Sequence, residues 1–253
     1  MTPSDDGILS PFPMHTDRVG PLAVLVANQG DLRSLCDHLG LAGRNGASFF
    51  MSRLYADPAV PGRRPFCLTG PVLGAAYAAL LAETLIASGA GTLIFWGWAG
   101  AIADTLFTGD VLVPSAALAD DGVTAAYLSD SAAGISDVPV AEPAPEATKA
   151  VTTALEQEGI PFSSAPVWTT GAVFRETPAR VGRFRKMGAQ AVEMETSALF
   201  SVARFRNVNA AALLAVSDEL FSGTWKPGFF DPRFLETRKQ LCNAMARLCT
   251  ATP

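Results

Sequence analysis

Three carboxylates follow apolar segments of the chain, at positions from which a side chain can reach a binding site. Glu193 and Glu195 lie on either side of Met194, where an apolar run gives way to a helical pattern. Asp218 closely follows the apolar run of residues 210–216. A buried carboxylate is costly unless a partner or ligand binds it, so these positions are candidates for chemistry. Each also has a structural explanation, because acidic residues favour helix N-termini and turns.

Cleavage of the bond between a sugar and a base would use carboxylates in two ways. The reaction passes through a sugar cation that resembles an oxocarbenium ion. A carboxylate that holds the sugar hydroxyls fixes the sugar and stabilises this positive charge. A second acid protonates the departing base, because a purine leaves poorly as an anion. A glycosidase that acts on sugar polymers with paired carboxylates stays an alternative.

Short apolar strands alternate with helices along the chain. Strands are expected at residues 21–27, 66–69, 92–96, 110–114, 161–168, 189–194 and 210–216, and helices at 32–39, 73–88, 147–158, 196–206 and 232–249. This alternation predicts an α/β fold with a mostly parallel or mixed central sheet flanked by helices. We expect a single domain over residues 1–253, with an N-terminal extension at 1–18 and a surface excursion at 129–147.

Ligands of such sheets collect beyond the carboxyl ends of the strands. Six polar segments of this chain fall at those ends. They are residues 28–31, 69–71, 97–100, 169–171, 193–195 and 217–219.

The composition argues against several classes of function. The formal net charge is -5 and no run is rich in Lys or Arg, so nucleic acid is not an expected partner. No apolar run is long enough to cross a membrane, and the first residues lack the pattern of a secretory signal, so we expect a cytoplasmic protein. The four cysteines are not spaced as a zinc or redox site, and His15 and His38 form no ligand set, so no metal is implied.

Several segments together resemble the nucleoside phosphorylase family, which includes purine and uridine phosphorylases and the adenosylhomocysteine-type nucleosidases. The strongest are VEMETSALFSVARF at residues 192–205 and AALLAVSDE at residues 211–219. GWAGAI at residues 97–102 and TGDVLVPSAALADDG at 108–122 are similar to the family's glycine loop and the strand that follows it. TGPVLGAA at residues 69–76 is similar to its glycine-rich turn into a helix.

The resemblance implies a role for each matched residue. Glu195 would bind the ribose hydroxyls, with Met194 packed against the sugar, and Asp218 would protonate a purine-like base. Phe174 would stack on the base or be an ordinary core aromatic. The remaining residues that the resemblance puts around the substrate are Glu193, Thr169, Gly97, Trp98, Ala99 and His15. His15 would reach a neighbouring subunit's ribose or be a plain surface histidine, and Trp98 would line the site or be a packing or interface residue.

The phosphate site departs from the family pattern. Gly30 and Arg33 of the NQGDLR turn, with Arg53, are the candidates to bind phosphate. Where the family has an arginine just before the glycine loop, this chain has Phe95 or Trp96. Where the family has a hydroxyl residue within the loop, this chain has Trp98. A phosphate site without a fixed, forked donor binds weakly.

Three functions therefore stay open. The first, which the resemblance favours, is a nucleoside phosphorylase, a pentosyltransferase that cleaves a purine-like nucleoside with phosphate as co-substrate and no other cofactor and gives free base and ribose 1-phosphate. The second is hydrolysis on the same fold, with Asp31 either activating water or capping the helix expected from Leu32. The third is a nucleoside-binding protein without turnover. The resemblance also implies a homodimer or hexamer with sites near the subunit boundaries.

Overall fold

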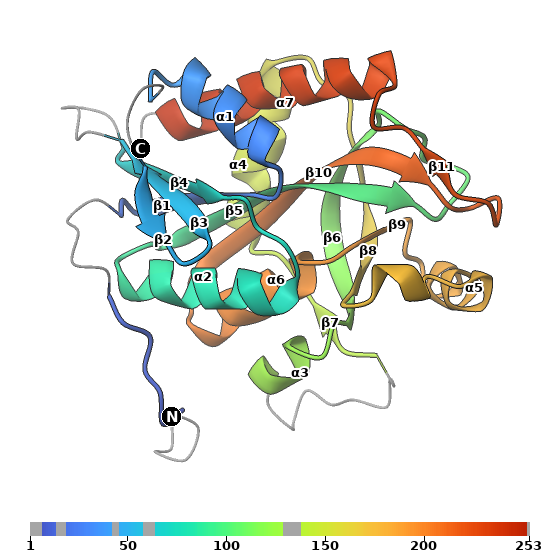
Figure 1. Cartoon of the computed structure of the whole chain (residues 1–253), viewed down its shortest axis with the longest axis horizontal. Coiled ribbons are helices and arrows are strands. Elements are labelled where there is room, and N and C mark those ends of the chain that lie inside the picture. Colours follow the sequence, from blue (N-terminus) through green and yellow to red (C-terminus); the bar gives the residue numbers. More distant parts are fainter. Residues whose placement is uncertain (1–6, 14–18, 42–45, 58–63, 129–137, 252–253) are drawn as a thin grey trace.

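The computed structural model describes residues 7–13, 19–41, 46–57, 64–128 and 138–251. Within them, an α/β fold is built around one mixed sheet with helices on both faces, which confirms the predicted fold class (Figure 1). The strands are β1 Leu22–Val26, β2 Ala47–Phe49, β3 Ser52–Ala56, β4 Phe66–Gly70, β5 Thr92–Ala101, β6 Val111–Asp120, β7 Val140–Ala141, β8 Ser163–Thr170, β9 Ala191–Glu193, β10 Asn209–Glu219 and β11 Lys226–Pro227.

Five of the strands close into a ring. β10 pairs with β6, β6 with β8, β8 with β9 and β9 with β5, and β5 pairs with β10 again. β1, β4, β3 and β2 extend the sheet from β5 in that order. Since β1 and β10 both run parallel to β5, their carboxyl ends meet at the same edge of the sheet. This edge is where a ligand site is expected.

Two layers of helices cover the sheet (Figure 1). The helices are α1 Gln29–His38, α2 Ala75–Ala87, α3 Thr124–Tyr127, α4 Pro145–Gln157, α5 Pro178–Lys186, α6 Thr196–Phe205 and α7 Pro232–Thr250. Successive side chains of a strand point to opposite faces, so β1 serves both layers. Ala23 and Leu25 pack in the core under α2 and α6, whereas Val24 and Val26 pack in the core under α1, α4 and α7.

Several strands continue further than their local sequence predicts. The segment from Gly97 to Gly100 was expected as a loop but belongs to β5, because β10 pairs with it as far as Ala101 and β9 pairs at Gly100. Likewise β6 runs to Asp120, since β8 pairs with it from Leu112 to Asp120 with one register shift between Pro114 and Ala116. Backbone partners from distant parts of the chain supply hydrogen bonds that no local pattern reveals.

Helix α1 begins three residues earlier than expected. Asn28 is its N-cap and accepts hydrogen bonds from the backbone N–H groups of Gly30 and Asp31, at 2.8 and 3.4 Å. Asp31 is therefore a first-turn residue, and the interpretation of Asp31 as the cap is wrong.

Other elements were not expected from the sequence. They are the hairpin of β2 and β3, the helices α3 and α5, the short strand β11, and β7, which pairs with β6 inside the segment predicted as a surface excursion. Helix α4 also begins within that segment, at Pro145. In the described part of the chain, no helix is long and apolar enough to cross a membrane.

Candidate active site

A pocket of about 260 Å³ opens at the carboxyl ends of β1, β5, β9 and β10. Its walls come from four of the six polar segments that the sequence singled out, together with the turn before α2 and the turn after β8. The lining residues are Ala27, Asn28, Val72, Leu73, Trp98, Ala99, Gly100, Val173, Glu176, Val192, Glu193, Met194, Glu195, Ser217 and Asp218. Among these described residues there are four carboxylates and no Lys or Arg.

Glu193 holds the junction between β9 and α6. Its Oε2 accepts hydrogen bonds from the backbone N–H groups of Glu195 and Thr196, both at 2.8 Å, while Thr169 donates its hydroxyl to Oε1. The side chain that caps α6 is thus Glu193. The alternative that Glu195 caps the helix with its side chain is wrong, and Glu195 is left for another role.

Glu195 is buried and faces the turn that leads into α2. The backbone N–H of Gly74 donates to its Oε1. Burial, followed by the negative charge of Glu193, raises the pKa of the Glu195 carboxyl above its ordinary value. A buried carboxylate with little counter-charge is poised to accept hydrogen bonds from ligand hydroxyls, which would favour its ionised form. Met194, half-buried, lines the pocket beside it.

Asp218 lies on another wall of the pocket, near the end of β10. Its Oδ1 accepts a hydrogen bond from the Ser217 hydroxyl at 2.6 Å, and its Oδ2 accepts one from the Trp225 indole N–H at 2.8 Å. The register of β10 against β5 shifts between Val216 and Asp218, which re-aims side chains at this point. The absence of a side chain at Gly100 lets Asp218 and Leu220 lie close to the β5 backbone, because a Cβ at position 100 would lie 3.1 Å from Asp218 Oδ2 and 2.4 Å from the Leu220 side chain.

Glu176 is a further carboxylate of the pocket that sequence reasoning missed. It follows the 3-10 turn Val173–Arg175 after β8. Burial, followed by the charge of Asp218, raises the pKa of the Glu176 carboxyl to about 7, while Arg180 opposes the rise. A carboxyl that titrates near neutral pH in a cleft is typical of a functional site. Its sequence signal was its place in TTGAVFRET, directly after a strand end.

At a third wall, Trp98 connects the pocket to an ion pair. The Trp98 indole N–H donates to Asp31 Oδ2 at 2.8 Å, and Arg238 binds Asp31 Oδ1 at 2.7 Å. Burial raises the pKa of Asp31, although the bonds from Arg238 and Trp98 oppose this. Asp31 and Arg238 do not line the pocket themselves. Their pairing joins positions 207 apart in the sequence, so no local pattern could predict it.

The three residues predicted to bind phosphate do not line the pocket. The Gly30 N–H is engaged by Asn28, and Arg33 is an exposed side chain of α1. Arg53 lies on β3 and donates to the Gly46 carbonyl at 3.1 Å. The structure therefore does not gather the expected phosphate ligands within one chain.

The remaining predicted substrate residues divide into three groups. Trp98 and Ala99 line the pocket. Gly97 and Thr169 are buried and do not line the pocket. Thr169 donates its hydroxyl to Glu193, and position 97 has no room for a side chain because a Cβ there would lie 2.6 Å from the Phe95 ring. Phe174 is 98% exposed and does not line the pocket, and His15 lies outside the described residues.

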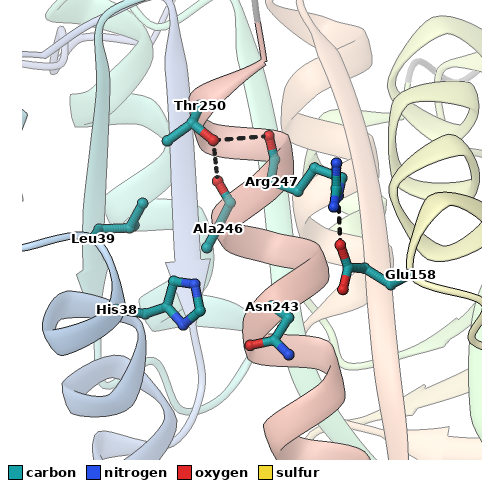
Figure 2. A pocket seen from close by; sticks show the side chains of 7 residues that line it. All are labelled: His38, Leu39, Glu158, Asn243, Ala246, Arg247 and Thr250. Atoms are coloured by element: carbon teal, nitrogen blue, oxygen red, sulfur yellow. Dashed lines mark hydrogen bonds and ion pairs between the residues drawn. The ribbon is translucent and has the colours of Figure 1, made fainter.

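Two further hollows lie along helices α1 and α7. One, of about 620 Å³, is lined by His38, Leu39, Glu158, Asn243, Ala246, Arg247 and Thr250, with Arg247 paired to Glu158 (Figure 2). The next, of about 610 Å³, shares His38 and Asn243 with it and includes Asp31 and Arg238. The Asp31–Arg238 pair therefore faces this groove.

Comparisons with known proteins agree with the geometry. Residues 21–252 match the phosphorylase superfamily. The chain is 24% identical over 208 residues to a guanosine phosphorylase of Halorubrum lacusprofundi, covering 82% of this chain and 81% of that one.

Two solved structures share the fold. One is a purine nucleoside phosphorylase from Toxoplasma gondii in complex with immucillin-H (TM-score 0.76, 16% identity, 97% of each chain). The other is a Campylobacter jejuni 5'-methylthioadenosine/S-adenosyl homocysteine nucleosidase (TM-score 0.74, 20% identity, 91% of this chain and 98% of that one). With a superfamily match that spans nearly the whole sequence, this chain belongs to the phosphorylase superfamily.

Proposed function

We propose that this protein hydrolyses the N-glycosidic bond of a purine nucleoside. The observation that carries the proposal is that Glu195 and Asp218 line one pocket from different strands, at the ends of β9 and β10. One carboxylate is then available for the sugar and the other for the base. This division of roles fits a reaction whose sugar becomes cationic while the base must gain a proton.

At the sugar end, Glu195 accepts hydrogen bonds from two ribose hydroxyls. Its buried position makes these bonds strong, because little water competes for the carboxylate. Met194 packs against the sugar next to it. The negative charge of Glu195 stabilises the sugar cation as the bond to the base breaks.

At the base end, the carboxylic acid form of Asp218 donates its proton to the departing purine. The water that attacks C1′ of the sugar releases a proton to solvent, from which Asp218 is protonated again. Trp225 and Ser217 hold its two oxygens, so the carboxyl has a fixed direction. The ionised carboxylate of Glu176 accepts a hydrogen bond from an N–H group at the edge of the base that lies far from the sugar. A 6-oxopurine offers such an N–H, whereas the matching atom of a 6-aminopurine is an acceptor and would need Glu176 protonated. We therefore expect 6-oxopurine nucleosides to be preferred above the Glu176 pKa of about 7.

Water is the acceptor that the pocket favours. None of its described lining residues is a Lys or Arg, and none of Gly30, Arg33 and Arg53 lines it, so the pocket of one chain offers no cationic side chain to a phosphate dianion. Phosphorolysis is the second candidate. It is favoured by the guanosine phosphorylase relative and would require cations from outside the pocket of one chain, for which Arg53 of a neighbouring subunit is the candidate.

A nucleoside panel tests the proposal. Purified protein is incubated with inosine, guanosine, adenosine and uridine at pH 6 and pH 8, and free base is measured by chromatography. We expect hypoxanthine and guanine release at pH 8, more adenine release at pH 6 than at pH 8, and little uracil. Equal rates for all four nucleosides would contradict the assigned roles of Asp218 and Glu176. The Glu195→Gln variant is the control for a contaminating activity.

A further inference from the structure

Trp98 stands between the active-site pocket and the ion pair of Asp31 and Arg238. Its half-buried side chain lines the pocket, and its indole N–H binds Asp31. The Arg238 guanidinium lies 4.8 Å from the centroid of the Trp98 ring. The ring also packs against Phe234 and Phe229, with centroids 5.1 and 6.1 Å away. The indole is therefore fixed by a hydrogen bond, a cation and two aromatic rings.

The positive charge of Arg238 is paired with the carboxylate of Asp31. Both its Nε and its Nη2 lie 2.7 Å from Oδ1 of Asp31, whose side chain is only 4% exposed. A guanidinium bound in this way has little remaining attraction for an anion, because the buried carboxylate neutralises it at close range. A phosphate coming from the pocket would have to displace Asp31 to bind Nε and Nη2 of Arg238, whereas the other side of Arg238, which is 21% exposed, lines the groove along α1 and α7.

The Trp98 ring is the second obstacle. Arg238 is a cation next to a residue that lines the pocket, yet it does not line the pocket itself. An anion coming from the substrate side therefore meets the indole first. Removing the ring would join the pocket to the guanidinium, and removing the Asp31 charge would free the guanidinium to bind.

We propose that Trp98 and Asp31 form an acceptor filter that keeps inorganic phosphate in the active-site pocket from binding Arg238 and so determines that water attacks the sugar. The inference rests on the proposed hydrolytic function and names the residues that would set it. It makes Trp98 a specificity-determining residue of the pocket and Asp31 a positioning residue that acts through Arg238.

Phosphate binding by isothermal calorimetry tests the filter without any turnover. The double variant Trp98→Ser with Asp31→Asn should bind inorganic phosphate roughly tenfold or more tightly than the wild-type protein, as expected for one newly available charge-assisted contact. Adding Arg238→Gln to this variant should abolish the gain. Trp98→Phe, which keeps an aromatic ring in place, should bind phosphate as poorly as the wild type.

The outcomes separate the filter from the proposed function. Equal phosphate affinity in the wild type and a folded double variant, or a gain that survives Arg238→Gln, would overturn the filter and leave hydrolysis standing. Phosphate-dependent base release by the wild type would overturn hydrolysis itself. If the double variant fails to fold by circular dichroism, Asp31→Asn is combined with Trp98→Leu, which removes the indole but keeps an apolar side chain against Phe234. Unchanged phosphate affinity in that folded variant would refute the filter.

Discussion

Replacing Glu176 with glutamine should stabilise the folded protein at alkaline pH. Burial and the charge of Asp218 raise the pKa of Glu176 from its ordinary value of 4.5 to about 7 in the folded state. The folded protein therefore binds this proton more tightly than the unfolded chain does. The stability that the carboxyl contributes is fully present below pH 4.5 and is lost as pH rises through about 7. Glutamine carries no charge and avoids this loss.

The size of the effect follows from the two pKa values. A rise from 4.5 to about 7 corresponds to at most about 3.4 kcal/mol, at about 1.36 kcal/mol per pKa unit. Because Glu176 is only partly buried, water screens the interaction and we expect about 1–2 kcal/mol. For a chain of this length that is a rise of roughly 2–8 °C in Tm.

Urea unfolding at pH 5 and pH 8 measures this contribution. The other pocket carboxylates titrate in both proteins, so the difference between the wild type and Glu176→Gln isolates one group. The variant should be more stable by about 1–2 kcal/mol at pH 8 and by less than about 0.5 kcal/mol at pH 5. Glu236→Gln, which alters an exposed carboxylate of α7, is the matched control and should show no such change. Parallel stability curves for the wild type and Glu176→Gln would refute the reasoning.

Three further substitutions probe the pocket. Glu195→Gln should lower kcat/KM for inosine by roughly 10²–10³, since it removes the charge that stabilises the sugar cation, and a loss below about tenfold in steady-state base release would contradict that role. Asp218→Asn should lower inosine turnover by roughly 10²–10⁴ but spare 4-nitrophenyl riboside, whose leaving group needs no proton; equal losses on both substrates would exclude Asp218 as the acid. Gly100→Ala places a Cβ 2.4 Å from Leu220 Cδ1 and 3.1 Å from Asp218 Oδ2, both of them side-chain ends that can shift, so it should cost no more than about 1 kcal/mol in urea unfolding but displace Asp218 and lower inosine turnover, whereas unchanged turnover would mean that the position of Asp218 does not depend on Gly100.

Much of the fold and part of the pocket could be predicted because their signals are local. Apolar runs followed by polar residues mark the strands and their carboxyl ends, and Glu193, Glu195 and Asp218 were found in this way. A parallel sheet brings such ends to one edge, so the grouping followed from the fold class. The assignment of Glu195 to the ribose and Asp218 to the base stays a prediction.

The rest depends on contacts between distant residues. Arg238 meets Asp31 only because α7 packs beside α1, and β5 runs past Gly97 only because β10 and β9 pair with it. Whether Glu193 or Glu195 faces a ligand depends on which of the two side chains caps α6, and the sequence is compatible with either as the cap. Such outcomes are set by tertiary packing, which local propensity does not encode.

The dependence of base release on phosphate tests the central claim most directly. The protein is freed of phosphate by dialysis, incubated with inosine at pH 8 with and without added phosphate, and both hypoxanthine and the sugar product are measured. Hydrolysis predicts equal rates in the two conditions and free ribose as the product. Release that requires phosphate and yields ribose 1-phosphate would contradict it.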